Sequence, residues 1–263
     1  MLNREVLRSC RKGVYTAPTL RAALDLVSEA AEQLGFLGAS CVFWPRAKQS
    51  AEELPPPAVR LSGSNLGAGA DAWNSGYIKN ELFRCDFVFR ACQNTAIPFV
   101  WSYDYLPGIV FGVEQKSTVG EALGIERLMK TTGFRGGISV PIRAPGGFFG
   151  YISFVSDGKF DYLKTKCEDS GDWLLGLAYH FYDAIADKLV LQEARDRNLT
   201  PRQLQCLKLI AIGKTIDETA EILGLSYSTV RFHLKAAEMN LGTMSRANAI
   251  RKAAALGVLG DMD

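Results

Sequence analysis

Hydrophobic and polar positions first follow a helical period near the N-terminus. From residue 20 to residue 34, apolar side chains recur every three or four positions, which places them on one face of a helix. Pro18 precedes this run, and Gly35 follows it at the position where helices commonly end in a left-handed glycine. The pattern predicts an amphipathic helix packed on a core.

The spacing then changes along the chain. Residues 39–44 form an apolar run that is typical of a strand. Residues 46–59 contain three consecutive prolines and predict an exposed loop. Near residues 70–83 the period is helical again, so we expect a short helix there.

The clearest strand signal is a hairpin. Apolar and other side chains alternate over residues 138–142, and residues 150–155 form a second run that is largely apolar. A Pro-Gly-Gly turn at residues 145–147 separates the two runs. We expect two antiparallel strands.

A long helix and a change of pattern mark the domain boundary. Large apolar residues at helical spacing predict a helix over residues 171–194, whose charged end is typical of a linker. Helices and antiparallel strands mix before this point, whereas every later segment is helical. We therefore expect a first domain over residues 1–188, a linker over 189–198 and a second domain over 199–263.

Composition limits the class of protein. Hydrophobic residues make up 48% of the 263, which is typical of a globular protein. No apolar run reaches the roughly 18 residues that a membrane span needs, and charges near the start argue against a signal peptide. We expect a cytoplasmic protein with no membrane partner. The six cysteines lack CxxC spacing and the two histidines lie far apart, which predicts reduced thiols and neither metal, cofactor nor catalytic triad.

Charge is distributed unevenly between the two ends. Ten basic and five acidic residues lie between Arg195 and Leu256, a formal charge of +5. The total of +2 leaves −3 for all other residues. A small basic module beside a mildly acidic body is the pattern of a DNA-binding protein, although a solvated helical surface has the same composition.

The basic module has the local signals of consecutive short helices. Thr200 and Pro201 suit the N-cap and first position of one helix, and Thr215 suits the cap of the next. After a turn at residues 224–226, a helix over residues 227–240 is expected, and a fourth follows over residues 245–256.

The helix over residues 227–240 has two distinct faces. Three apolar side chains point to one side: Val230, Leu234 and Ala237. Four polar ones remain on the other: Ser228, Thr229, Arg231 and Lys235. Arginine can pair with a guanine edge, whereas hydroxyls and lysine mostly bind phosphates, so this helix has the chemistry of a major-groove reader.

These residues resemble the LuxR-type DNA-binding domain over about sixty positions. The resemblance rests on Leu199-Thr200-Pro201-Arg202, Gly213-Lys214-Thr215, Ala220-Glu221-Ile222-Leu223, Ser226, Thr229-Val230-Arg231-Phe232-His233-Leu234 and Leu241-Gly242. It implies DNA contacts from six residues: Ser228, Thr229, Arg231, Lys235, Lys214 and Thr215. Gln203 departs from the family's usual glutamate, which concerns one supporting polar contact and not the fold.

The first domain contains a spaced set of aromatic and acidic residues. Trp73 and Tyr77 are four apart and share one face of a helix; Asp86 follows Trp73 by 13 positions, and Trp101 lies 15 further on. Such a cluster by itself suits a hydrophobic core or a pocket. The spacing, however, resembles the signal-binding domain of LuxR quorum-sensing receptors, and Gly137 matches that family's glycine at the sheet of the pocket.

The resemblance implies a role for each of these residues toward an acyl-homoserine lactone. Trp73 would donate its indole N–H to the lactone carbonyl, and Tyr77 its hydroxyl to the acyl carbonyl. Asp86 would accept the amide N–H, and Trp101 would cover the lactone ring. A neutral amphiphile needs such polar contacts at its head and an apolar slot for its tail.

Three departures concern the tail of that pocket. Phe87 stands where the family usually has proline, Gly69 stands where many members have an aromatic residue, and residues 110–118 look like extra length. The alternative is an orphan LuxR-type regulator that senses a different small molecule or acts without ligand.

Pattern and resemblance together predict a ligand-responsive transcription regulator that binds a palindromic DNA operator as a homodimer. The expected fold is α+β: an α/β/α sandwich with an antiparallel sheet for the ligand, followed by an all-α four-helix helix-turn-helix domain. An enzyme is disfavoured because no nucleophile and base can be assembled around Asp86. A phosphorylated receiver is disfavoured because the strand at residues 39–44 is followed by Pro-Arg-Ala and not by an acidic site.

Overall fold

The computed structural model of the protein describes residues 2–45, 57–84, 86–102, 109–110, 113–114, 133–143 and 148–259. Two compact units divide within a long helix, between Ile185 and Ala186. Among the described residues, no helix is both long and apolar enough to cross a membrane. The five described cysteines are free thiols, as expected; Cys85 lies outside the described residues.

Two helices open the first unit: α1 (Leu2–Thr16) and α2 (Leu20–Gln33). The prediction of α2 is confirmed: Thr19 caps it by accepting the Ala22 amide, and Gly35 follows its end with φ +86°. We did not predict α1. Its buried residues Leu7, Cys10 and Val14 have helical spacing, which is the signal that the sequence offered.

A single sheet forms the centre of the first unit. Its strands are β1 (Gly38–Pro45), β2 (Val59–Ser62), β3 (Phe99–Ser102), β4 (Ile109–Val110), β5 (Val113–Glu114), β6 (Gly136–Arg143) and β7 (Phe148–Ser156), in the order β2-β1-β7-β6-β3-β4-β5. The hairpin is confirmed, because β6 and β7 pair antiparallel with Ile138 opposite Phe154; its turn residues, 145–147, lie outside the described residues. The loop expected over residues 46–59 is wrong at its last residue, because Val59 is buried in β2 and pairs with Phe43 of β1.

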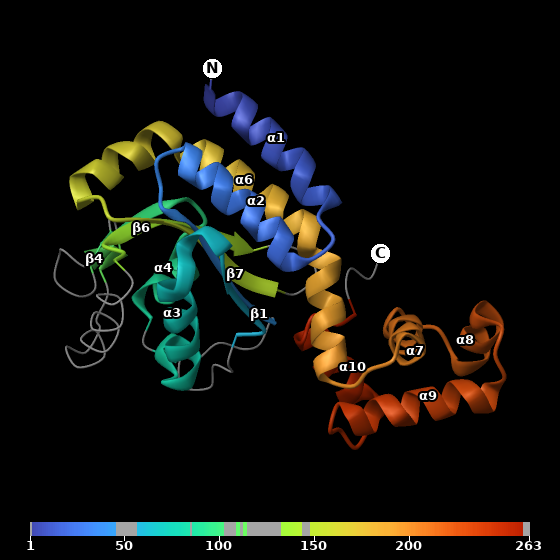
Figure 1. The fold of residues 1–263 in the computed structure, drawn as a ribbon. Helices are drawn as coiled ribbons and strands as arrows, with labels where there is room; N and C mark the ends of the chain where they lie inside the picture. Colours follow the sequence, from blue (N-terminus) through green and yellow to red (C-terminus); the bar gives the residue numbers. More distant parts are fainter. Residues whose placement is uncertain are drawn as a thin grey trace. The chain divides into compact units, whose positions relative to one another are not determined.

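Helices cover both faces of this sheet, which confirms the α/β/α sandwich. In Figure 1, α1, α2 and α6 (Phe160–Asp196) lie over one face, and α3 (Gly67–Lys79) and α4 (Phe87–Asn94) lie over the other. Two short 3-10 helices, η2 (Ser64–Leu66) and η3 (Leu82–Arg84), flank α3. Every residue of β7 is buried, as expected for a strand covered on both faces.

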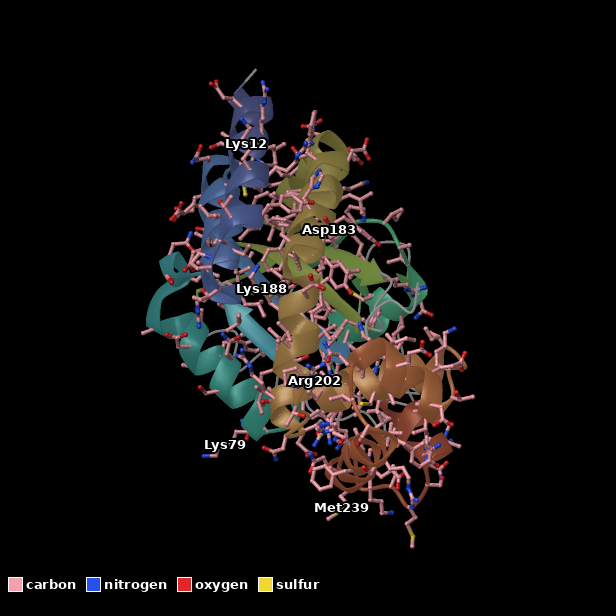
Figure 2. All side chains as sticks on the ribbon, turned by 90° about the vertical axis from the view of Figure 1, so that its right-hand side faces the viewer. Lys12, Lys79, Asp183, Lys188, Arg202 and Met239 are labelled. Carbon is pink, nitrogen blue, oxygen red and sulfur yellow. The ribbon has the colours of Figure 1, made fainter. Side chains whose placement is uncertain are left out.

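The expected helices of the first unit need two corrections. The helix predicted at residues 70–83 begins earlier and ends at Lys79, because Phe83 belongs to η3. The helix predicted from residue 171 begins at Phe160 and continues to Asp196, so most of the segment expected as a linker is helical. On the exposed face of α6, Asp183 (Figure 2) accepts a 2.8 Å hydrogen bond from the Tyr15 hydroxyl of α1.

The second unit contains the expected four helices: α7 (Pro201–Ala211), α8 (Ile216–Leu223), α9 (Tyr227–Asn240) and α10 (Arg246–Ala255). Their apolar faces form one core, which also includes Ala194 and Leu199 from the chain before α7. Thr200 caps α7 and Thr215 caps α8, each in a reciprocal capping box. These caps confirm the helix starts predicted at Thr200 and Thr215.

Candidate ligand pocket and nucleic-acid interface

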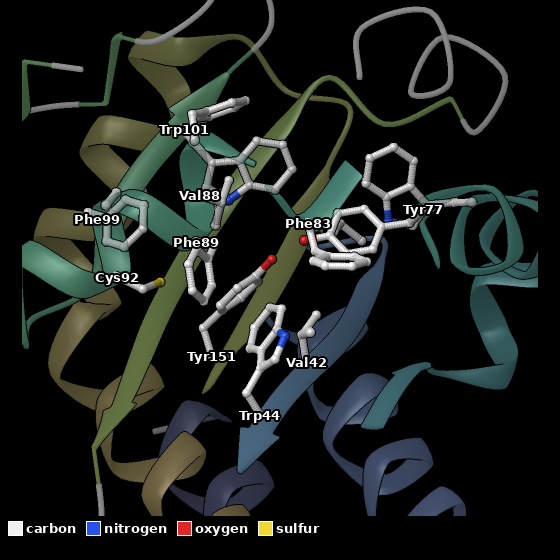
Figure 3. Packing of buried hydrophobic residues seen from close by; sticks show 14 of the residues in the cluster. Val42, Trp44, Tyr77, Phe83, Val88, Phe89, Cys92, Phe99, Trp101 and Tyr151 are labelled. Atoms are coloured by element: carbon white, nitrogen blue, oxygen red, sulfur yellow. The ribbon is translucent and has the colours of Figure 1, made fainter. Parts of the chain in front are cut away.

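Aromatic side chains fill the space between the sheet and helices α3 and α4. Trp73 and Tyr77 lie one turn apart on α3 with ring centroids 5.5 Å apart, as their spacing predicts. From the sheet side, Tyr151 of β7 lies beside Phe89 and Trp44 (Figure 3). This cluster is the hydrophobic core on the α3 and α4 face.

Asp86 is buried at the first turn of α4 and accepts three hydrogen bonds. Its Oδ1 accepts the Val88 amide at 2.8 Å, which caps the helix. Its Oδ2 accepts the hydroxyls of Tyr77 at 2.5 Å and of Tyr151 at 2.7 Å. The cap also accounts for Phe87, because the first helical position accepts proline but does not require it.

The two tyrosines remain protonated donors at neutral pH. Burial, followed by the negative charge of Asp86, raises the pKa of Tyr77 well above its usual value, and the same two causes raise that of Tyr151. The resemblance implied that the Tyr77 hydroxyl contacts a ligand, but in this structure it donates to Asp86. Sequence reasoning missed Tyr151, whose partner lies 65 positions away.

Trp101 and Gly137 face each other across neighbouring strands. They are directly paired in the β3–β6 register. The Trp101 indole donates to Ser139 Oγ at 2.8 Å, and Phe87 contacts the same ring edge-on at 6.4 Å between centroids. A Cβ on Gly137 would lie 3.0 Å from the Trp101 ring and 2.5 Å from the carbonyl oxygen of Phe154, so the close approach requires glycine.

A small cavity of about 30 Å³ opens among these residues. Its lining includes Trp73, Asp86 and Trp101, and also Arg60 of β2 and Tyr151, which the sequence did not single out. Tyr77 and Gly137 contact residues of this lining: Tyr77 donates a hydrogen bond to Asp86, and Gly137 pairs with Trp101 across the β3–β6 strands. A cavity of this size holds a water molecule or two, so a larger ligand must displace the side chains around it.

The second unit presents the expected helix with an apolar and a polar face. Val230, Leu234 and Ala237 of α9 are buried, which confirms the predicted inner face. On the outer side, Ser228, Arg231 and Lys235 are exposed and Thr229 is half-buried.

The polar side chains of α9 differ in how firmly the protein holds them. The Ser226 hydroxyl caps the helix and lies 2.8 Å from both the Ser228 and the Thr229 hydroxyl, a hydroxyl cluster at a helix N-terminus where anions bind favourably. Lys235 pairs with Glu238 at 3.0 Å. Arg231 makes no hydrogen bond or ion pair within the described part of the chain, so its guanidinium is available to a partner.

The other two predicted DNA contacts, Lys214 and Thr215, lie at the start of α8. The backbone amide and the hydroxyl of Thr215 both donate to the Glu218 carboxylate, which lowers the pKa of this exposed carboxyl, and the Thr215 hydroxyl also accepts the Glu218 amide. Lys214 lies 3.7 Å from the same carboxylate. Both side chains are exposed and thus remain accessible.

Gln203, which stands where the family usually has glutamate, still makes supporting polar contacts. Its Oε1 accepts the Thr200 amide at 3.0 Å and the side-chain amide of Asn240 at 3.2 Å. The second contact joins the start of α7 to the end of α9. Glutamine therefore serves as the third-position residue of this capping box.

Comparison with known proteins gives matches for both units. The model of the autoinducer binding domain matches residues 19–185, and that of bacterial regulatory proteins, luxR family, matches residues 197–253. The transcriptional activator AhyR of Aeromonas hydrophila is 25% identical over 192 residues, 72% of this chain and 70% of its own length. The transcriptional activator LuxR of Aliivibrio fischeri is 25% identical over 205 residues, 78% of each chain.

Solved structures agree on the fold. The crystal structure of Escherichia coli SdiA matches 97% of this chain and 98% of its own, with a TM-score of 0.60 at 19% identity. A structure of SdiA in complex with octanoyl-rac-glycerol matches 98% of this chain and 96% of its own, with a TM-score of 0.52 at 18% identity.

Proposed function

The chain belongs to the luxR family of bacterial regulatory proteins and carries that family's autoinducer-binding domain, and from this we propose that an acyl-homoserine lactone is its signal and controls its binding to DNA. The relatives AhyR and LuxR are transcriptional activators, which supports the same role here.

The observation that carries the lactone assignment is a pair of polar groups on one cavity. Trp73 and Asp86 both line it. The Trp73 indole N–H has no acceptor within the described residues, so it is available to a lactone carbonyl. Among the described residues, Val88 alone donates to Asp86 Oδ1, which thus retains a lone pair for a ligand amide N–H.

Tyr77 has a different role in this proposal from the one that the resemblance implied. Because its hydroxyl donates to Asp86, it orients the carboxylate toward the cavity and does not need to touch the acyl carbonyl. Trp101, held by Ser139, covers the lactone ring, and Gly137 lets it lie close to β6. Each buried tail methylene contributes about 0.8 kcal/mol, so the tail supplies most of the affinity.

The proposed DNA contacts follow from exposed side chains of α9 and of the start of α8. Arg231 reads a base edge, while Lys235, Lys214 and the hydroxyls of Ser228, Thr229 and Thr215 bind phosphates. One such helix covers a half-site, so two copies bind a palindrome with half-sites roughly 34 Å apart. The candidate dimer contact is α6, where Tyr162 and Trp173 are 47% and 41% exposed.

Ligand-induced melting of the full chain tests the lactone assignment. Lactones with acyl chains of increasing length should raise the melting temperature, because a ligand that binds only the folded state stabilises it. Trp73→Phe should reduce that rise. Trp44→Phe is the matched control, because Trp44 belongs to the same aromatic cluster but does not line the cavity.

The outcomes separate the alternatives. No rise with any lactone contradicts the lactone assignment, and a rise with octanoylglycerol alone supports the alternative of a different small molecule. Equal losses in Trp73→Phe and Trp44→Phe contradict the role of Trp73. For DNA, a chain that binds a single half-site as tightly as the full palindrome contradicts the dimer.

A further inference from the structure

Arg60 places a positive charge at the cavity without satisfying its hydrogen-bond donors. Its guanidinium carbon lies 3.6 Å from the Tyr77 ring centroid and 5.2 Å from that of Trp73. The side chain lines the same cavity as Asp86. Its Nε and Nη1 atoms are buried and have no hydrogen-bond partner in the described part of the chain.

This arrangement is costly without a further partner. The faces of Tyr77 and Trp73 stabilise the charge of the guanidinium, but its N–H groups lie in its own plane and still need acceptors. Buried donors are nearly always paired, because losing water without gaining an acceptor is unfavourable. The described strands and helices around the cavity give Nε and Nη1 of Arg60 no acceptor.

Asp86 does not serve as that acceptor. Its oxygens accept from Tyr77, Tyr151 and the Val88 amide, and no ion pair joins it to Arg60 among the described residues. All three of these donors are neutral and none belongs to Arg60, so the planar donor edges of Arg60 remain for a separate group. A guanidinium matches a carbonyl, hydroxyl or carboxylate oxygen in its plane.

We propose that the signal carries an oxygen acceptor on its acyl chain, close to the amide, and that Arg60 binds and selects this oxygen. The inference rests on the proposed lactone, since Trp73 and Asp86 then hold the lactone and the amide. Arg60 lies against Trp73 and against Tyr77, and the Tyr77 hydroxyl donates to Asp86. The guanidinium is therefore expected to contact an atom of the acyl chain that lies near the head group. A 3-oxo group and a 3-hydroxyl group share the required chemistry, because each places an oxygen acceptor next to the amide end of the chain.

The test compares ligands that differ only in this oxygen. Dissociation constants of the full chain are measured for hexanoyl, 3-oxohexanoyl and 3-hydroxyhexanoyl homoserine lactones. We expect at least one oxygenated ligand to bind about tenfold or more tightly than the hexanoyl ligand, which corresponds to about 1.4 kcal/mol. Which of the two does so distinguishes a ketone from a hydroxyl group.

Variants then assign the preference to Arg60. Arg60→Met keeps the aliphatic stem and should abolish the preference while hexanoyl binding changes less than about threefold. Arg60→Lys keeps a charge over the rings but loses the planar donor edges, so it should lower the preference as well. Arg84→Met is the matched control, because Arg84 also lies over a ring, that of Phe83 at 5.4 Å, but does not line the cavity.

Each result decides the matter. Equal affinity of the wild-type chain for all three ligands overturns the inference while leaving the lactone assignment in place. Equal weakening of all three by Arg60→Met overturns it as well, because the arginine is then only part of the wall. If Arg60→Met does not fold, the wild-type panel and Arg60→Lys still decide. Binding of no lactone at all overturns both this inference and the proposed function.

Discussion

Replacement of Asp86 by alanine should destabilise the first domain even in the absence of ligand. The change removes the acceptor of the Tyr77 and Tyr151 hydroxyls and the cap of α4. All three donors are then left buried without their partner. The carboxylate therefore has a structural role in addition to the proposed contact with a signal.

The magnitude follows from those three contacts. A lost N-cap costs about 0.5 to 2 kcal/mol, and each buried donor left unpaired costs about 1 to 3 kcal/mol. The two hydroxyls can rotate toward each other, which reduces the sum, and we expect about 3 to 5 kcal/mol, as for a broken buried charge interaction. For a domain of this size each kcal/mol lowers the melting temperature by about 2 to 4 °C, so the loss is roughly 6 to 20 °C.

Asp86→Asn separates the structural role from the binding role. Asparagine caps a helix as well as aspartate does, and the hydroxyls can turn to accept from its amide group. The free energy of unfolding of this variant should lie within about 1 to 2 kcal/mol of the wild-type value. Signal binding should still weaken by roughly tenfold, because a charged acceptor becomes neutral.

Differential scanning calorimetry of the wild type and both variants, with and without a lactone, measures these effects. Asp86→Ala melting within about 2 °C of the wild type would refute the structural role derived from the hydrogen bonds. An undiminished ligand-induced rise in both variants would refute the contact between Asp86 and the signal.

Three further predictions concern the sheet and the DNA-binding domain. Gly137→Ala should lower the free energy of unfolding by about 1 to 3 kcal/mol, because the added methyl meets a backbone oxygen at 2.5 Å. It should also alter the near-ultraviolet circular dichroism of the tryptophans, and an unchanged spectrum and melting temperature would contradict this prediction. Arg231→Ala should cost about 1 to 3 kcal/mol and relax sequence preference, whereas Lys235→Ala should weaken all duplexes and reduce the salt slope by about one; equal losses on all sequences for both would mean that the base contact is misassigned. Because the pKa of Glu218 is lowered in the folded state, its hydrogen bonds with the Thr215 amide and hydroxyl stabilise the domain above the ordinary carboxyl pKa and are lost as the pH falls through the lower folded value. Thr215→Val removes the hydroxyl but keeps the backbone amide, so it should reduce this part of the acid dependence, and an identical pH profile of melting would count against it.

Much of the second domain could be predicted from the sequence, because its signals are local. Thr200 and Thr215 cap helices through amides three residues away, and the buried face of α9 recurs within two turns. The hairpin of β6 and β7 is equally local. In such segments, the interactions that form the helix or hairpin join residues that are close in sequence, so the sequence alone reveals them.

The pocket depends on contacts that no local pattern contains. The sequence indicated Trp73, Asp86 and Trp101, but not Tyr151, which reaches Asp86 from a strand 65 positions later. Arg60 belongs to β2, which begins at the end of a segment expected to be a loop, so nothing along the chain placed its charge over the ring of Tyr77.

Tertiary structure also decided what Asp86 does. Its position as an N-cap can be inferred from the helix that follows, but the choice of hydroxyl donors depends on which strands pair and in which register. A carboxylate in this cluster must find donors because it is buried, and the sheet brings β7 and α3 close enough to supply them. Burial and strand order are properties of the whole domain, so they set the chemistry of this site where spacing along the chain could not.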